Sequence, residues 1–194
     1  MTVTVPIEIH GYVSCPFAWR VRLAAAEKGI PADWIPCDVE HPDPRARTHN
    51  PDEHSPLLWT EGFTLLESDV ILQYLDEGFE GPALMPPQAR ARAELRLTAA
   101  QLRTLDAHQE HSRPAARRKS EPALRALEEA LADRDYLHGA TPGVVDALCW
   151  PFLADLGVRG LVPAATFPRA AAYLTRAAAR DAFKETRPPW AHRL

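Results

Sequence analysis

The segment Gly78–Gln88 (GFEGPALMPPQ) limits the folds open to this chain, because its three prolines and two glycines interrupt any helix or strand. Before it, strand-like and helix-like patterns alternate. After it, the sequence is rich in Ala, Leu, Arg and Glu at helical spacing. The two sides also differ in charge: residues 1–86 contain 5 Lys or Arg and 14 Asp or Glu, whereas the remainder contains 17 and 12. The sequence therefore predicts two folding units of opposite net charge.

The part before this segment predicts a mixed α/β unit. Val5–Tyr12 alternates apolar and polar residues, as a half-buried strand does. Phe17–Lys28 carries Ala and Leu at helical spacing and stops at Gly29, a residue suited to the end of a helix. The other predicted elements are a strand at Trp34–Val39, a turn of helix within Pro42–Asn50, a hairpin of Leu57–Trp59 and Phe63–Leu66 around Thr60-Glu61-Gly62, and a helix at Ser68–Glu77.

The part after the segment predicts an all-α unit. Its expected helices are Ala89–Glu110, Ser120–Ala132, Val144–Leu156 and Ala170–Ala179, and the breakers between them are Pro114, Gly139, Pro142 and Pro163. Gly143, three residues before Asp146, has no side-chain oxygen, so we expect no reciprocal capping box at this helix start. The predicted domain boundaries are residues 1–80 and 89–194, with 81–88 as the linker.

Composition and cysteine usage exclude several classes of protein. With 46% hydrophobic and 25% charged residues, the 194-residue chain has the composition of a globular protein. Its apolar runs are too short to span a membrane, and Met1–Ile9 lacks the features of a secretory signal. Cys15, Cys37 and Cys149 are odd in number and widely spaced, which fits neither a disulfide framework nor a zinc site. The cysteine usage suits a reducing cytoplasm, so we expect a cytoplasmic protein with no membrane or metal partner. The arginines of the basic half spread along helix faces, so we expect no nucleic-acid partner.

The stretch SCPFAWRVR places Cys15 directly before a predicted helix. Pro16 suits the first helical turn, because proline lacks the N–H donor that this position leaves unused. The helix dipole and the free N–H groups at a helix start favour the thiolate form of a cysteine. The alternative is that Cys15 is a buried, inert small residue. Cys37, in a predicted strand, and Cys149, on an apolar helix face, are expected to be core residues.

Two further stretches carry groups that can bind a ligand. Ser55 precedes Pro56; a cis bond there would expose the backbone of Ser55 to an extended peptide, whereas a trans bond would make an ordinary loop. Glu67 and Ser68 begin a helix, where Ser68 and free N–H groups can bind an anion and Glu67 can bind an ammonium group. The alternative is a simple helix cap beside a solvated acid. Together with a thiolate, these groups match the needs of a γ-glutamyl thiol tripeptide.

The segments CPFAWRVRLAAAEKGI, SPLLWTEGFTLLESDVILQYLDE and VVDALCWPFLADL resemble those of the cytosolic glutathione transferases in order and spacing. The resemblance covers essentially the whole chain. It implies a thioredoxin-like α/β domain with a mixed four-stranded sheet, followed by an all-α helical-bundle domain. The CPF motif and the WPF sequence are similar to those of the omega class. Trp19-Arg20-Val21-Arg22 is similar to the zeta class, which has serine in the place of Cys15.

The resemblance implies a role for each candidate site residue. Cys15 is expected to be the catalytic thiol and Phe17 to line the glutathione site. Ser55, before Pro56, is expected to pair its backbone with the cysteinyl part of glutathione, and Glu67 and Ser68 to hold the γ-glutamyl end. The omega-class lysine that contacts the glycyl carboxylate falls near Pro42, where no basic residue stands; His41 or Arg45 could substitute. A homodimer is also implied.

A cysteine in this position can itself form a mixed disulfide. We therefore expect a glutathione-dependent thiol transferase, with glutathione as co-substrate and a glutathionylated protein or a small molecule, such as dehydroascorbate or an S-glutathionyl ketone, as substrate. Ala18 stands where a C-x-x-C motif has its second cysteine, so a monothiol route follows. The first alternative is a conventional conjugating transferase. The second is a non-catalytic partner-binding module, as with bacterial starvation proteins of this fold that bind RNA polymerase.

Overall fold

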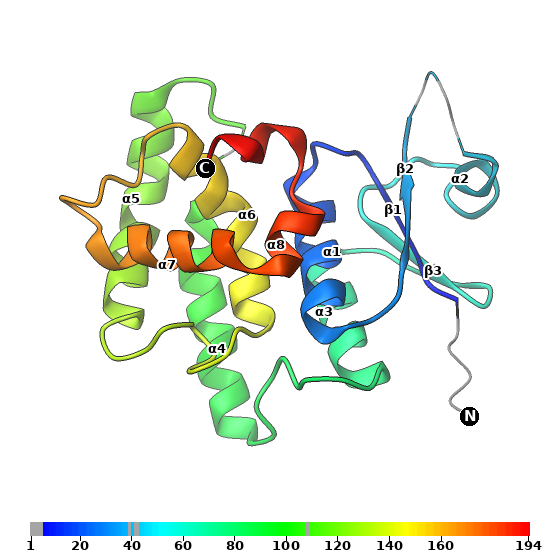
Figure 1. The fold of residues 1–194 in the computed structure, drawn as a ribbon, viewed down its shortest axis with the longest axis horizontal. Helices are drawn as coiled ribbons and strands as arrows, with labels where there is room; N and C mark the ends of the chain where they lie inside the picture. The colour runs from blue at the N-terminus through cyan, green and yellow to red at the C-terminus, as the bar shows by residue number, and fades with distance from the viewer. Residues whose placement is uncertain (1–5, 39, 41–42, 108) are drawn as a thin grey trace. The chain divides into compact units, whose positions relative to one another are not determined.

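The computed structural model describes residues 6–38, 40, 43–107 and 109–194. The chain forms two compact units, Met1–Pro82 and Ala83–Leu194, the first built around a sheet and the second from helices (Figure 1). None of the described helices combines the length and apolar character that crossing a membrane requires.

The first unit is a four-stranded mixed sheet with three helices, which confirms the predicted fold class. The strands lie in the order β2-β1-β3-β4; β1 pairs parallel with β2 and antiparallel with β3, and β3 pairs antiparallel with β4. The elements are β1 (Glu8–Gly11), α1 (Pro16–Lys28), β2 (Asp33–Pro36), α2 (Pro44–His49), β3 (Leu57–Thr60), β4 (Phe63–Leu65) and α3 (Ser68–Gly78).

The alternation of β1 separates the two faces of this sheet. Successive side chains of a strand point to opposite faces, so Ile9 lies on one face and Glu8 and His10 on the other. Figure 1 shows α1 and α3 on one side of the strands and α2 on the other. Ile9 is 2% exposed, whereas His10 is fully buried on the side of α2, where it bonds to Glu8. Burial lowers the pKa of His10, so its imidazole is neutral at pH 7.

The predicted hairpin is confirmed, and its turn explains its register. Glu61 and Gly62 both have positive φ, 44° and 79°, as a two-residue type I′ turn requires. Thr60 and Phe63 therefore pair directly across the turn. Helix α1 likewise ends as predicted, at Gly29 in the left-handed conformation with φ 73°.

The second strand is shorter than predicted. It ends at Pro36, so Cys37 lies one residue beyond the strand instead of within it, although its N–H still bonds to the carbonyl of Gly11 at 2.9 Å. Proline cannot donate a ladder hydrogen bond, which accounts for the end of the strand. Two of the residues placed in predicted strands, Val5 and Val39, lie outside the described residues.

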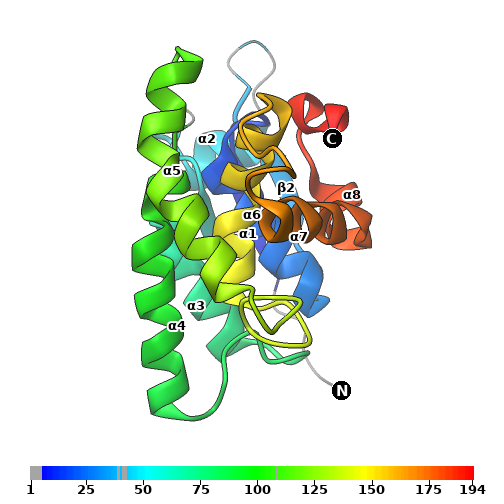
Figure 2. The ribbon, with the colours of Figure 1, turned by 90° about the vertical axis from the view of Figure 1, so that its left-hand side faces the viewer.

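The second unit is helical, as predicted, with different boundaries. Its elements are α4 (Ala89–Gln101), a 3₁₀ turn (Leu102–Leu105), α5 (Arg113–Ala130), α6 (Val144–Val158), α7 (Pro168–Ala179), α8 (Asp181–Thr186) and a 3₁₀ turn (Pro189–Arg193). Figure 2 shows α4 and α5 as long helices along one side of this unit. The first predicted helix was too long, and the last two elements were missed.

Pro114 was wrongly predicted to break a helix. It lies in the first turn of α5, where a missing N–H costs nothing, and the hydroxyl of Ser112 accepts the N–H of Ala115 at 3.3 Å as a cap. Helix α5 therefore begins seven residues before the predicted Ser120, and it continues through Pro122.

The side chain of Asp146 provides the hydrogen-bond acceptor at the start of α6, because Gly143 has no side chain. Its buried carboxylate accepts the N–H of Gly143 and of Leu137, each at 2.8 Å, the N–H of His138 at 3.2 Å and the hydroxyl of Tyr173 at 2.6 Å. One half of a capping box thus forms, from the N–H of Gly143 to Asp146; the reciprocal half needs a side-chain oxygen that glycine lacks, as the sequence predicted. A Cβ on Gly143 would clash with the carbonyl of Leu84, so close packing requires glycine there. Burial raises the pKa of Asp146, and the four donors oppose that shift.

This network predicts a large loss of stability for Asp146→Ala. We expect the free energy of unfolding to fall by at least about 3 kcal/mol, because each buried donor left without an acceptor costs about 1–3 kcal/mol. Asp146→Asn keeps one oxygen and should lose less. Urea unfolding followed by circular dichroism measures both, with the exposed Asp133→Ala as the control. Equal losses for Asp146→Ala and Asp133→Ala would contradict this description.

Candidate functional site

Cys15 lies at the start of α1, as the sequence predicts. It is the N-cap residue, with extended backbone angles (φ −72°, ψ 119°), and Pro16 begins the helix. Its side chain caps no backbone N–H, so the helix start is left to interact with the sulfur or with a ligand. Its N–H donates to the carbonyl of Tyr12 at 3.0 Å, which closes the turn between β1 and α1. The side chain is half-buried, so reagents can reach the thiol.

Ser55 lies beside Cys15 although the two are 40 residues apart. The thiol of Cys15 donates to the carbonyl of Ser55 at 3.7 Å, and the hydroxyl of Ser55 accepts the N–H of Tyr12 at 2.9 Å. The Ser55-Pro56 peptide bond is cis, the isomer in which the sequence analysis expected an exposed backbone. The structure thus brings two of the predicted site residues together at the end of β1.

Gly11 makes the close approach of Ser55 to Cys15 possible, and it was not among the predicted site residues. A Cβ at Gly11 would lie 2.8 Å from both the Cβ of Ala18 and the Oγ of Ser55, closer than such contacts occur. Any other residue would therefore push α1 and the Ser55 loop away from β1. A glycine at the end of a strand, shortly before a helix, is the signal that could have identified this position.

Glu67 and Ser68 differ strongly in exposure at the start of α3. Glu67 is exposed and has a φ of 63° and a ψ of 106°, whereas Ser68 is only 4% exposed. A non-glycine residue in so sparsely populated a backbone region costs on the order of 1–3 kcal/mol, and such residues cluster at binding sites. The carbonyl of Glu67 still accepts hydrogen bonds from the N–H groups of Val70 and Ile71. The unusual backbone angles of Glu67 therefore leave the first hydrogen bonds of α3 intact.

Arg20 connects α1 to Ser68 and was not among the predicted site residues. Its guanidinium donates to the hydroxyl of Ser68, with Nε at 2.9 Å, and pairs with the carboxylate of Asp69. It also lies over the ring of Phe17, 4.9 Å from the centroid. Since the oxygen of Ser68 accepts from Arg20, its own proton remains to donate to an anion. A basic residue three positions after Phe17, on the same helix face, was the available signal.

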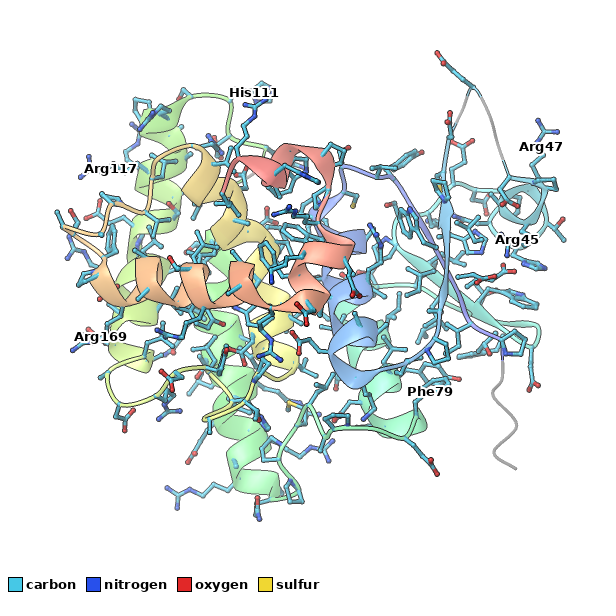
Figure 3. The ribbon with its side chains drawn as sticks, in the orientation of Figure 1. Arg45, Arg47, Phe79, His111, Arg117 and Arg169 are labelled. Carbon is cyan, nitrogen blue, oxygen red and sulfur yellow. The ribbon has the colours of Figure 1, made fainter. Side chains whose placement is uncertain are left out.

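Arg45, one of the two proposed substitutes for the missing lysine, is held by acidic neighbours. Figure 3 shows it extending from α2 together with Arg47. Its guanidinium bonds to Asp33 at 2.8 Å and to Asp43 at 3.2 Å, and these bonds raise the pKa of Arg45. A negatively charged ligand would have to compete with both carboxylates. The other proposed substitute, His41, lies outside the described residues.

The two remaining cysteines, Cys37 and Cys149, differ in burial. Cys149 is 4% exposed on α6, as expected of a core residue. Cys37 is half-buried instead of fully buried, and the side-chain amide of Asn50 donates to its sulfur at 3.5 Å. Burial raises the pKa of the Cys37 thiol. No disulfide joins cysteines in the described part of the chain.

These environments predict an order of alkylation. Iodoacetamide should modify Cys15 first, because it is accessible and the helix start stabilises negative charge on its sulfur. Cys37 should react more slowly, since its raised pKa leaves less thiolate at neutral pH, and Cys149 should react only on unfolding. Peptide mass spectrometry of timed samples measures the three rates. Faster modification of Cys37 or Cys149 than of Cys15 would contradict the assignment.

Comparison with known families matches both units. The profile described as "Glutathione S-transferase, N-terminal domain" matches residues 9–83, and "Glutathione S-transferase, C-terminal domain" matches residues 87–176. Together they include every candidate site residue named above. The matches therefore support a functional relationship as well as a shared fold.

Individual relatives agree with the profiles. The chain is 34% identical to "Probable glutathione S-transferase GSTU1" of Oryza sativa subsp. japonica over 72% of its own length and 69% of that protein. It is 27% identical to "Maleylacetoacetate isomerase" of Pseudomonas aeruginosa, over 94% and 96%. For some other plant relatives, the match spans less than half of the relative's length. The crystal structure of rice GST1 in complex with glutathione superposes with a TM-score of 0.81 at 28% identity, covering 97% of this chain and 93% of that one.

Proposed function

Because this chain belongs to the glutathione S-transferase family, we propose that it is a glutathione-dependent thiol transferase with Cys15 as its nucleophile. The observation that carries the proposal is the position of Cys15 as the N-cap residue of α1, half-buried and with its side chain uncommitted to capping. Thiolates attack disulfides, and a helix start stabilises a thiolate. The omega-like CPF sequence at residues 15–17 supports the same subtype.

The proposed reaction has two thiol–disulfide exchange steps. The Cys15 thiolate attacks the glutathionyl sulfur of a mixed disulfide; the new bond joins Cys15 to glutathione, and the substrate leaves as a thiolate that takes up a proton. The thiolate of a second glutathione then attacks the same glutathionyl sulfur. Glutathione disulfide leaves, and the Cys15 thiolate is restored. Ala18 offers no second thiol within the motif, so external glutathione completes the cycle.

The surrounding residues support binding of glutathione in the orientation this reaction needs. We propose that the backbone of Ser55, before Pro56, pairs with the cysteinyl part of the tripeptide, which would bring its sulfur toward Cys15. The Ser68 hydroxyl and the start of α3 face the γ-glutamyl carboxylate, and Glu67 faces the ammonium group. Phe17 lines the same site, and Arg20 between Phe17 and Ser68 adds positive charge near the carboxylate.

Conventional conjugation is the second candidate, because the similarity to plant and isomerase relatives does not extend specifically to a thiol-transferring class. In that reaction, the site would activate the thiol of glutathione for attack on an electrophile, and Cys15 would form no covalent intermediate.

We also propose a homodimer, since Phe63, Leu66 and Val70 expose large apolar side chains that a second copy could cover. A monomeric mass by light scattering would remove that part of the proposal.

Cys15→Ser separates the two candidates. We expect it to abolish reduction of a glutathione mixed disulfide, because a serine hydroxyl cannot form the covalent intermediate. Glutathione affinity should change little, since the groups that hold the tripeptide remain. Cys37→Ser is the matched control and should keep its activity. Full disulfide-reducing activity in Cys15→Ser would rule out covalent catalysis, and a gain of conjugating activity would favour the second candidate.

Glu67→Gln tests the binding site without relying on Cys15. Losing a charge-assisted partner typically costs about 1.5–3 kcal/mol, so the dissociation constant for glutathione should rise roughly 10- to 150-fold. Glu61→Gln is a matched control, because Glu61 is also exposed and also has a positive φ. Calorimetric titration with glutathione measures both. Unchanged affinity in Glu67→Gln, or an equal loss in Glu61→Gln, would contradict the proposed γ-glutamyl site.

A further inference from the structure

Glu8, His10 and His49 form a compact cluster on the sheet face that carries α2, on the side of β1 opposite Ile9. Glu8 and His10 are two residues apart on β1, and His49 is the last residue of α2. One carboxylate oxygen of Glu8, Oε2, lies 3.0 Å from Nε2 of His10 and 2.7 Å from Nδ1 of His49. The three potential ligand atoms all lie within 4.8 Å of one another.

The cluster is buried and held in place. Glu8 is 7% exposed and His10 is fully buried, while the side chain of His49 is 21% exposed and gives a route from solvent. The ring of His49 stacks on Trp59, with 3.9 Å between centroids and an interplanar angle of 1°. The strand fixes two of the groups and the stacking fixes the third, so little ordering is needed before a ligand binds.

We propose that Glu8, His10 and His49 bind a divalent transition-metal ion of the Zn²⁺ type, in a site separate from Cys15. Two imidazole nitrogens and one carboxylate oxygen are a donor set that suits zinc and its neighbours, with a fourth position left for water. Ligand atoms about 2.0–2.2 Å from a tetrahedral ion lie about 3.4 Å apart. The present separations of 3.0 and 2.7 Å would have to open by about 0.4 and 0.7 Å to reach this value.

Binding requires that the ring nitrogens facing Glu8 lose their protons. Nε2 of His10 and Nδ1 of His49 now face the Glu8 carboxylate, so they carry the protons that the carboxylate accepts. An ion would replace these two protons, and each proton would move to the other nitrogen of its ring. The negative charge of Glu8 then faces the ion.

Two features set an upper limit on affinity. Nδ1 of His10 is buried and has no hydrogen-bond partner among the described residues, so it would carry its proton without an acceptor. Metal-bound histidines normally donate this proton, and losing such support weakens binding about 10- to 100-fold. In addition, Nη1 of Arg45 lies 3.8 Å from the other oxygen of Glu8 and repels a cation. We therefore expect a dissociation constant in the micromolar range rather than the nanomolar range.

The test is calorimetric titration of the full chain, without a histidine tag, with Zn²⁺. We expect one ion per chain, a higher thermal midpoint with Zn²⁺ than with Mg²⁺, and cobalt d–d absorption when Co²⁺ replaces Zn²⁺. His49→Ala and Glu8→Gln should each weaken Zn²⁺ binding at least tenfold. His111→Ala, which removes an exposed histidine that bonds to the carbonyl of Gln109, should leave it unchanged.

Two outcomes would overturn the proposal. One is the absence of Zn²⁺ binding at millimolar concentration. The other is binding that survives in both His49→Ala and Glu8→Gln but disappears once Cys15 is alkylated, which would place the ion on the thiol. His49 lies at the end of a short surface helix, so its variant keeps the test valid even if Glu8→Gln fails to fold.

Discussion

The close approach at Gly11 is the constraint on which the first unit depends. The end of β1, the first turn of α1 and the loop carrying Ser55 meet where a single methyl group would be 2.8 Å from two of them. β1 lies between β2 and β3 in the sheet, so the end of β2 and the start of β3 lie beside the end of β1. Cys15 and Ser55 become neighbours through that packing, and the thiol of Cys15 reaches the Ser55 carbonyl.

The charged side chains of the first unit discussed above form two separate groups, one around Arg20 and one around Arg45. Arg20 spans α1 and α3, pairing with Ser68 and Asp69, and so places a cation near the start of α3. Arg45 instead belongs to the group of acids around α2, Asp33 and Asp43. Arg20 is itself paired with Asp69, so the feature of the first group that suits the carboxylate of a peptide ligand is the start of α3 with the Ser68 hydroxyl. In the second group, Arg45 is bonded to both Asp33 and Asp43. The arrangement supports a glutathione site with stronger contacts at its γ-glutamyl end than at its glycyl end.

Local chemistry made much of the fold predictable from the sequence. Gly29 ends α1, and Glu61-Gly62 makes the hairpin turn, because each needs only the conformation of one or two residues. Predictions failed where a distant residue decides the outcome. The network around Asp146 includes Leu137 and Tyr173, nine and 27 positions away, which no local pattern indicated. Pro114 is a different case, because Ser112, which caps its helix, lies only two positions before it. For the site, the position of Cys15 follows from Pro16, whereas the contact of Arg20 with Ser68 joins residues 48 apart and has no local pattern.

The central claim is that the sulfur of Cys15 forms a disulfide with glutathione. Incubating the folded protein with glutathione disulfide, followed by peptide mass spectrometry without reduction, tests it directly. The claim predicts a glutathionyl adduct on the peptide that contains Cys15, formed before any on Cys37 or Cys149, and lost when reduced glutathione is added. A protein that binds glutathione but never carries the adduct on Cys15 would contradict the claim.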